Sequence, residues 1–222
     1  MVGRMSKHVR RVASSQRKWE AGGCKRHRRE HWLVDNQIYF ITARCHEGLR
    51  VFEGENAKAV FWTCFDRHTA AQQAVPIITS LINNHYHTLL YLELGSKLPT
   101  LMKHLHGSAS KLTNDLREAA GRPRLPHVWQ AGLRDSYFDG CIRNATQFRR
   151  TYRYVKRQGV RHGLVHPGES YPHTRVRVAL EPALKRALEL DAFLPWSDKT
   201  RFAKRPNPPG ERSSDRGTSG SR

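Results

Sequence analysis

The chain has few of the residues that mark disulfide-bonded, zinc-stabilised or membrane proteins. Its 222 residues include only four cysteines, at positions 24, 45, 64 and 141, and no two of them have CxxC spacing. Neither a zinc knuckle nor a disulfide framework is therefore indicated. The positively charged N-terminus has no apolar run behind it, and no uncharged apolar segment approaches the length of a membrane span. These absences predict reduced thiols, a cytoplasmic location and no contact with a membrane.

Acidic side chains are also scarce. The chain has 19 Asp and Glu against 39 Lys and Arg, a formal net charge of +20. Such a charge favours a polyanionic partner, because it attracts phosphate backbones over long distances. If the partner is DNA, the protein is expected to be associated with the nucleoid. Charge alone does not choose between DNA and RNA, so a basic RNA-binding or ribosome-associated module stays open.

The composition divides the chain into a central domain and two appendages. Residues 1–30 contain ten Lys or Arg, two Glu and almost no apolar periodicity, which predicts a basic flexible arm. Residues 197–222 are rich in Pro, Gly, Ser and Arg and cannot bury enough apolar surface to offset the entropy of ordering, which predicts a disordered tail. One domain over residues 31–180 and a short helix over 181–196 lie between them, without internal repeats.

Local patterns in the central domain predict a mixed fold. The expected elements are a strand at 37–44, a helix at 56–73 capped by Asn56, strands at 75–82 and 85–94 joined by a tight Asn83-Asn84 turn with positive φ, a helix at 99–120, a strand-like segment with a loop at 128–144, and a helix at 146–158. This order matches an α+β, ferredoxin-like antiparallel sheet with helices packed on one face.

Two histidines interrupt the aliphatic run "SLINNHYHTLLYL" at residues 80–92. On a strand, residues i and i+2 point to the same face, so His85 and His87 can share one cation. A second pair, His104 and His106, falls in a predicted helix, where the two side chains diverge by about 200°. Since the chain has 13 histidines, a chance pair with an ordinary half-buried role stays open as well.

The predicted helix at 146–158 carries a separate polar cluster. Phe148, Tyr152 and Val155 form the stripe that is expected to pack on the sheet. Tyr154 and Gln158 lie within about 40° of each other on the far side of that stripe, surrounded by arginines. Tyr154 could equally be an exposed tyrosine or one that stacks on a base, and the arginines could form an ordinary solvated face.

Four segments carry a family resemblance: His85-Tyr86-His87 after "IITSLINN", Trp129-Gln130, "FDGCIRN" at 138–144, and "YRYVKRQGVRHGLV" at 152–165. Together they resemble the insertion-sequence-200-like single-tyrosine HUH transposases, most closely the REP-associated tyrosine transposases. The resemblance covers about residues 31–175.

The resemblance implies that Tyr154 cleaves and rejoins hairpin-associated single-stranded DNA through a 5′-phosphotyrosine intermediate. It also implies a divalent ion, Mg²⁺ or Mn²⁺, at His85, His87 and Gln158, and a protein that acts as a monomer or homodimer. The residues expected to contact DNA are Arg149, Arg150, Arg153, Lys156, Arg157, Arg161 and Trp129.

The sequence departs from the family pattern at two places. It has Gln158-Gly159 where the family commonly has Asn-Pro, and it has "ESYPHTRV" at 169–176 where the family has a Trp-Pro type of motif. An amide ligand is retained, because Gln replaces Asn. A catalytically inactive, domesticated protein that binds DNA hairpins stays open as the alternative.

Overall fold

The structure, a computed structural model, describes residues 9–12, 31–130 and 137–193. The strands are β1 (Val9–Val12), β2 (His31–Val34), β3 (Gln37–Arg44), β4 (Val75–Leu81), β5 (His85–Leu92), β6 (Phe138–Cys141) and β7 (Thr174–Val176). The helices are α1 (Glu55–Ala71), α2 (Leu98–Ala119), α3 (Ala145–Lys156), α4 (Gln158–Arg161) and α5 (Leu180–Glu189), with 3-10 turns η1 (His46–Gly48) and η2 (Gly95–Lys97). The predicted tail at 197–222 lies outside the described residues.

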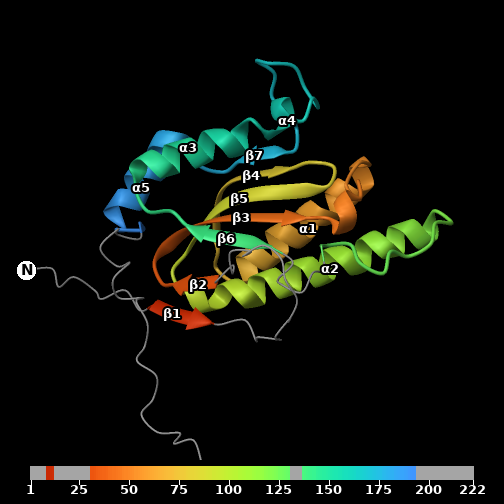
Figure 1. The fold of residues 1–222 in the computed structure, drawn as a ribbon, viewed down its shortest axis with the longest axis horizontal. Coiled ribbons are helices and arrows are strands. Elements are labelled where there is room, and N and C mark those ends of the chain that lie inside the picture. Colours follow the sequence, from red (N-terminus) through yellow and green to blue (C-terminus); the bar gives the residue numbers. More distant parts are fainter. Residues whose placement is uncertain (1–8, 13–30, 131–136, 194–222) are drawn as a thin grey trace, which may run out of the picture.

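A five-stranded antiparallel sheet organises the molecule, in the order β6-β3-β5-β4-β7 (Figure 1). β5 is the middle strand, and almost every residue on it is buried. A strand that is covered on both faces reads as a nearly continuous apolar run, which explains why the histidine pair lies among leucines. The predicted antiparallel α+β sheet is therefore confirmed.

The helices cover both faces of the sheet, so the expectation that they share one face was wrong. α1 and α2 bury one face together with Tyr39, Tyr86 and Leu90. α3 and α5 bury the other face, where Ile38 and Leu89 contact their apolar side chains. Figure 1 shows the two helix layers above and below the sheet. Because side chains alternate along a strand, the histidine pair of β5 faces the layer that contains α3.

The start of α1 and the turn between β4 and β5 differ from the sequence-based prediction. α1 begins at Glu55 after Gly54, so Asn56 lies inside the first turn and does not cap the helix. Asn83 and Asn84 do connect β4 and β5, but neither has positive φ. The turn is held from outside instead, because the backbone carbonyls of Asn83 and Asn84 accept hydrogen bonds from the amides of Phe52 and Cys45.

The first and the last described segments also differ from the sequence-based prediction. Val9–Val12, within the predicted basic arm, pairs antiparallel with β2, and the remainder of that arm lies outside the described residues. α5 ends earlier than expected because Asp191 takes φ 49°. The amides of Asp191 and Ala192 then bond back to Leu188 and Ala187, a Schellman motif that terminates the helix. No helix within the described ranges is long and apolar enough to cross a membrane.

Candidate active site

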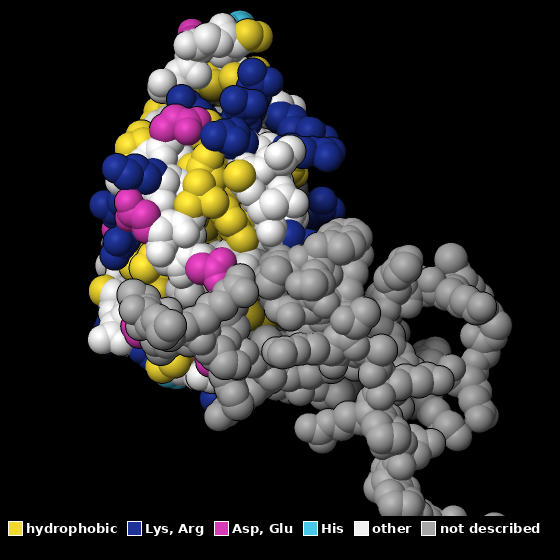
Figure 2. Space-filling view, turned by 90° about the vertical axis from the view of Figure 1, so that its left-hand side faces the viewer, with side chains coloured by type: hydrophobic (Ala, Val, Ile, Leu, Met, Phe, Trp, Pro, Cys, Tyr) yellow, Lys and Arg dark blue, Asp and Glu magenta, His cyan; other side chains and the backbone are white. Residues whose placement is uncertain are grey.

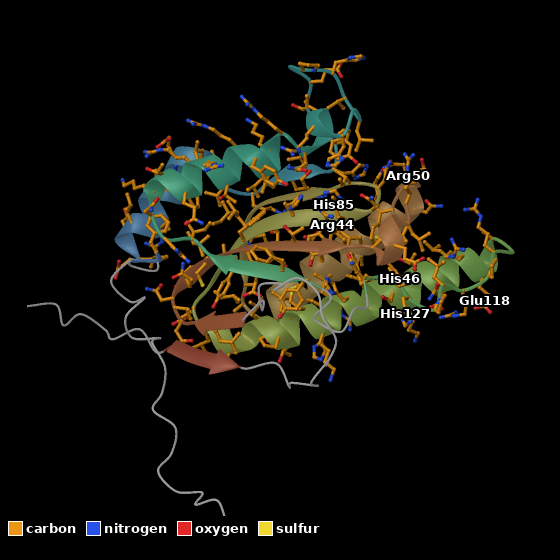
Figure 3. All side chains as sticks on the ribbon, viewed as in Figure 1. Arg44, His46, Arg50, His85, Glu118 and His127 are labelled. Atoms are coloured by element: carbon orange, nitrogen blue, oxygen red, sulfur yellow. The ribbon has the colours of Figure 1, made fainter. Side chains whose placement is uncertain are left out.

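The site forms where the ends of β3 and β5 meet the C-terminal end of α3. β3 and β5 pair so that Thr42 lies opposite His87 and Arg44 lies opposite His85. Opposed residues of an antiparallel pair point to the same face, so these four side chains form one polar patch. Figure 3 shows Arg44 and His85 together at this end of the sheet.

α3 is positioned by its cap and by its apolar stripe. The side chain of Asn144 accepts a hydrogen bond of 2.9 Å from the amide of Gln147, which satisfies one of the free donors at the helix start. Phe148, Tyr152 and Val155 are buried against the sheet, as predicted. Tyr152 also donates a hydrogen bond of 3.0 Å from its hydroxyl to the carbonyl of Val178, which fixes it in the core.

Tyr154 is turned toward the histidine pair and not toward open solvent on the far side of α3. Its hydroxyl oxygen lies 3.4 Å from Nε2 of His87, and the two ring centroids are 5.1 Å apart. Phe40 contacts both rings, stacking on His87 and meeting Tyr154 edge-on. The phenol that the sequence singled out and the predicted imidazole pair therefore meet at one place.

The two histidines are oriented by hydrogen bonds at their Nδ1 atoms. Nδ1 of His85 donates to Oδ1 of Asn84 at 2.8 Å, and Nδ1 of His87 lies 2.7 Å from the hydroxyl of Thr42. The rings are 4.8 Å apart. When both Nδ1 atoms carry the proton, both Nε2 lone pairs are available to a metal ion. Such an outer hydrogen bond normally accompanies a histidine ligand.

Burial keeps both imidazoles neutral. The pKa of His85 is lowered to about 4, first by desolvation and then by the proximity of His162 and Arg44. The pKa of His87 is lowered to about 3, first by desolvation and then by the proximity of His85. A metal ion requires the unprotonated ring, so no proton competes with it near neutral pH.

Gln158 supplies a buried acceptor but does not continue α3. The helix ends at Lys156, and Gln158 begins the short α4. Its Nε2 donates to the carbonyl of Tyr154 at 3.0 Å, whereas its buried Oε1 has no hydrogen-bond partner among the described residues. A buried acceptor without a partner is costly, and a cation would satisfy it. Imidazole nitrogens and an amide oxygen are donor types that a divalent ion accepts. The described residues contain no cluster of three His, Cys, Asp or Glu side chains that could hold a metal.

The two departures from the family pattern contact each other. A Cβ atom on Gly159 would lie 2.3 Å from Cβ of Tyr171, which belongs to the segment that replaces the Trp-Pro type of motif. A proline at position 159 would carry that Cβ atom. Residue 159 must therefore be glycine while Tyr171 keeps this position. Their contact fixes the backbone directly after Gln158.

A groove of about 620 Å³ runs beside Tyr154 along the exposed side of α3. We call it the arginine groove; its arginines are Arg149, Arg150, Arg153, Arg157 and Arg161, and Tyr154, Thr146 and Val160 complete its lining. The guanidinium of Arg161 lies over the Tyr154 ring, 5.5 Å from its centroid. Figure 2 shows Lys and Arg side chains gathered in the upper part of the molecule, the level at which Figure 1 places α3.

Two of the residues predicted to contact DNA lie elsewhere. Lys156 is exposed but does not line the groove. Trp129 was expected to contact DNA and this was wrong, because its side chain is 5% exposed and packs in the core between Phe52 and His106. Its indole N–H donates to the carbonyl of His106 at 3.1 Å. The indole ring of Trp129 therefore stabilises the core.

Sequence reasoning missed the residues that surround the pair. Thr42 and Arg44 reach the site through the register of β3 and β5, which no local pattern reveals. His162 lies with its ring 5.0 Å from that of His85. A signal for His162 did exist, since it follows Tyr154 and Gln158 at the four-residue spacing of one helix face.

No protein-family model matches the chain, and no curated protein matches it in sequence. Among solved structures, it is similar to a REP-associated tyrosine transposase bound to a REP hairpin, with a TM-score of 0.51 and 13% identity over 82% of this chain and 89% of that one. The chain shares the fold of this transposase. A crystal structure of a provisionally named transposase from Deinococcus radiodurans R1 also matches, with a TM-score of 0.40 and 14% identity over 55% of this chain and 89% of that one. The resemblance drawn from the sequence motifs is confirmed at the level of the fold.

Proposed function

We propose that the protein cleaves and rejoins single-stranded DNA beside a hairpin, with Tyr154 as the nucleophile. The observation that carries the proposal is the 3.4 Å separation between the Tyr154 hydroxyl and Nε2 of His87, at the end of a groove lined by five arginines. A phenol, an oriented imidazole pair and a phosphate-sized cationic surface are the parts that a phosphoryl transfer needs. The shared fold with a transposase bound to a REP hairpin supports a DNA hairpin as the partner.

The reaction exchanges one phosphodiester bond for another. The Tyr154 oxygen attacks the phosphorus atom, a bond forms between that oxygen and the 5′-phosphate, and the bond to the 3′-oxygen breaks. The released 3′-oxygen gains a proton as the phenol loses one, so the phosphotyrosine bond retains the energy needed for rejoining. Arg161, over the Tyr154 ring, stabilises the negative charge that develops on the attacking oxygen.

The remaining groups position the phosphate and its ion. His85, His87 and Gln158 would hold Mg²⁺ or Mn²⁺, and imidazole ligands favour Mn²⁺ of the two. When bound, the ion supplies a Lewis acid that polarises the phosphate. Arg150, Arg153 and Arg157 contact the backbone without reading sequence. Tyr154 lies beside His87 of the same chain, which supports a tyrosine that acts in cis, in a monomer or a homodimer.

The test is covalent capture. The protein is incubated with a single-stranded hairpin oligonucleotide and Mn²⁺, and denaturing electrophoresis then separates a protein–DNA adduct from free protein. Tyr154→Phe and chelation of the metal are each expected to abolish the adduct. Tyr152→Phe is the matched control, because this phenol is buried two residues away and bonds to Val178; it is expected to retain the adduct. An adduct that persists in Tyr154→Phe would refute the assignment.

A further inference from the structure

A second hollow, of about 190 Å³, lies next to the histidine pair. We call it the hairpin hollow, and it is lined by Arg50, Ile82, Asn83, Asn84, His162 and Leu164. Two of its lining residues also contact the candidate site, because Asn84 accepts the hydrogen bond from His85 and the His162 ring lies 5.0 Å from the His85 ring. Figure 3 shows Arg50 at the same end of the sheet as His85.

The hollow and the arginine groove are linked by a row of aromatic side chains. Successive ring centroids are 5.1 Å apart from Tyr154 to His87, 4.8 Å from His87 to His85, and 5.0 Å from His85 to His162. Tyr154 lines the groove and His162 lines the hollow. A DNA strand whose cleaved phosphate lies at the Tyr154 hydroxyl therefore has the groove beside that phosphate and the hollow within reach of an adjacent nucleotide.

The lining suits a nucleobase better than a phosphate. Ile82 is 2% exposed and Leu164 is half-buried, so part of the lining is apolar. The volume is below the range of about 300–1,000 Å³ that is usual for pockets of drug-sized ligands, which suits a single flat ring system. The hollow has only one permanent cation, Arg50, whereas the groove has five. Unstacked bases are commonly bound between such apolar or planar side chains and read at their edges.

The polar groups that remain free in the hollow can hydrogen-bond to the edge of a base. Asn84 is already committed, since its Oδ1 accepts from His85 and its Nδ2 donates to the carbonyl of Gly48 at 3.3 Å. The carboxamide of Asn83 makes no hydrogen bond to any part of the chain that the structure describes, although its backbone carbonyl is fixed by Phe52. Within the described residues, the exposed guanidinium of Arg50 pairs with the exposed Glu53 alone, and no carboxylate lines the hollow.

We propose that the hairpin hollow is a base-reading pocket for the nucleotide next to the cleaved phosphate, and that Arg50, whose guanidinium can only donate hydrogen bonds, favours guanine. Guanine presents two acceptors, N7 and O6, to one guanidinium, whereas the Asn83 carboxamide carries both a donor and an acceptor and can complete the contact at the base edge. This inference rests on the proposed function and adds sequence specificity to it. Arginine contacts in the groove position the strand, and the hollow selects which phosphate is cleaved.

The experiment uses sets of four hairpin oligonucleotides that differ only in one base beside the cleaved phosphate, with one set for each flanking position. Initial rates of adduct formation are measured with the wild-type protein, and affinities are measured by fluorescence anisotropy with Tyr154→Phe. At one position, guanine is expected to react about tenfold faster than the other three bases, the scale of one good side-chain contact to a base edge. Asn83→Leu and Arg50→Ala are each expected to reduce that ratio toward one.

The matched control is Arg186→Ala on α5, because Arg186 is also paired with an exposed glutamate three residues later in the sequence. It is expected to leave the base preference unchanged. Equal rates for all four bases at both positions, or a preference that survives both substitutions in the hollow, would overturn the pocket while adduct formation itself still stands. If no oligonucleotide forms an adduct, the proposed function fails, and the anisotropy ratios then decide the pocket separately.

Discussion

The arginine groove makes a quantitative prediction about the salt dependence of DNA binding. Four of its five arginines, all except Arg149, have no carboxylate partner in the described parts of the chain; Arg149 lies 3.6 Å from Glu181. If each free arginine neutralises one phosphate of a single strand, log K falls with log salt with a slope of about −2.8. Affinity should then drop about 50-fold between 50 and 200 mM salt.

The perturbation is the double substitution Arg153→Gln and Arg157→Gln, at two exposed positions that line the groove. Glutamine keeps a comparable helix propensity, so the change acts on charge more than on folding. Two phosphate contacts should remain, with a slope of about −1.4 and a loss of only about sevenfold over the same salt range. The weakening at low salt should be nearly equal for hairpins of different sequence, because these contacts do not read bases.

The assay is fluorescence anisotropy of a labelled single-stranded hairpin, carried out in the Tyr154→Phe background and without divalent ions. The control removes the same net charge from the opposite face of the sheet with Lys103→Gln and Lys111→Gln, both exposed on α2. This control is expected to leave the slope close to the unmodified value. If the two double variants change the slope equally, overall charge and not the groove accounts for binding, and the reasoning is refuted.

Three further predictions concern buried residues and their effect on stability. Gly159→Ala should lower the free energy of unfolding by several kcal/mol, measured by urea titration, because the added Cβ atom would overlap Tyr171. It should also weaken Mn²⁺ binding, measured by calorimetry. The control Gly107→Ala, at a helical position with open space around it, should be neutral or stabilising. Trp129→Ala should destabilise the fold by about 3–5 kcal/mol, while the affinity of the folded protein for DNA stays unchanged; a selective loss of affinity would restore a stacking role. Burial lowers the pKa of His106 to about 3, so between pH 6.5 and pH 3 the unfolded chain binds a proton that the folded chain does not, and the free energy of unfolding should fall over that range. The substitution His106→Gln should remove roughly 2 kcal/mol of the stability loss between pH 7 and pH 5. An unchanged pH dependence in that variant would contradict this.

Local sequence patterns located the main elements and the residues of interest. The two-residue period of a strand put His85 and His87 on one face, and the helical period separated Tyr152 in the core from Tyr154 outside the stripe. Such periodicities are properties of neighbouring residues, so they are readable without the fold. The same reasoning misplaced Trp129, because nothing local distinguishes a core indole from an exposed one.

The contacts that assemble the site depend on segments far apart in the chain. His87 meets Thr42 only through the pairing register of β5 with β3, and a shift of one residue would reverse every side chain. Gln158 belongs to α4 and not to α3, because α3 ends at Lys156. The residue after it, Gly159, packs against Tyr171 from a distant segment. The hairpin hollow likewise needs the β4–β5 turn, the segment after α4 and the loop before α1 together.

By itself, the sequence determined which residue types were present and on which main elements they lay, and its charge predicted a polyanionic partner. Only the tertiary structure decided that the helices cover both faces of the sheet and that the Tyr154 phenol meets the imidazole pair. The physical reason is that propensity and periodicity act over a few residues, whereas a reactive site requires atoms within hydrogen-bond distance from segments separated by tens of residues. That convergence is set by packing and strand register, which belong to the whole chain.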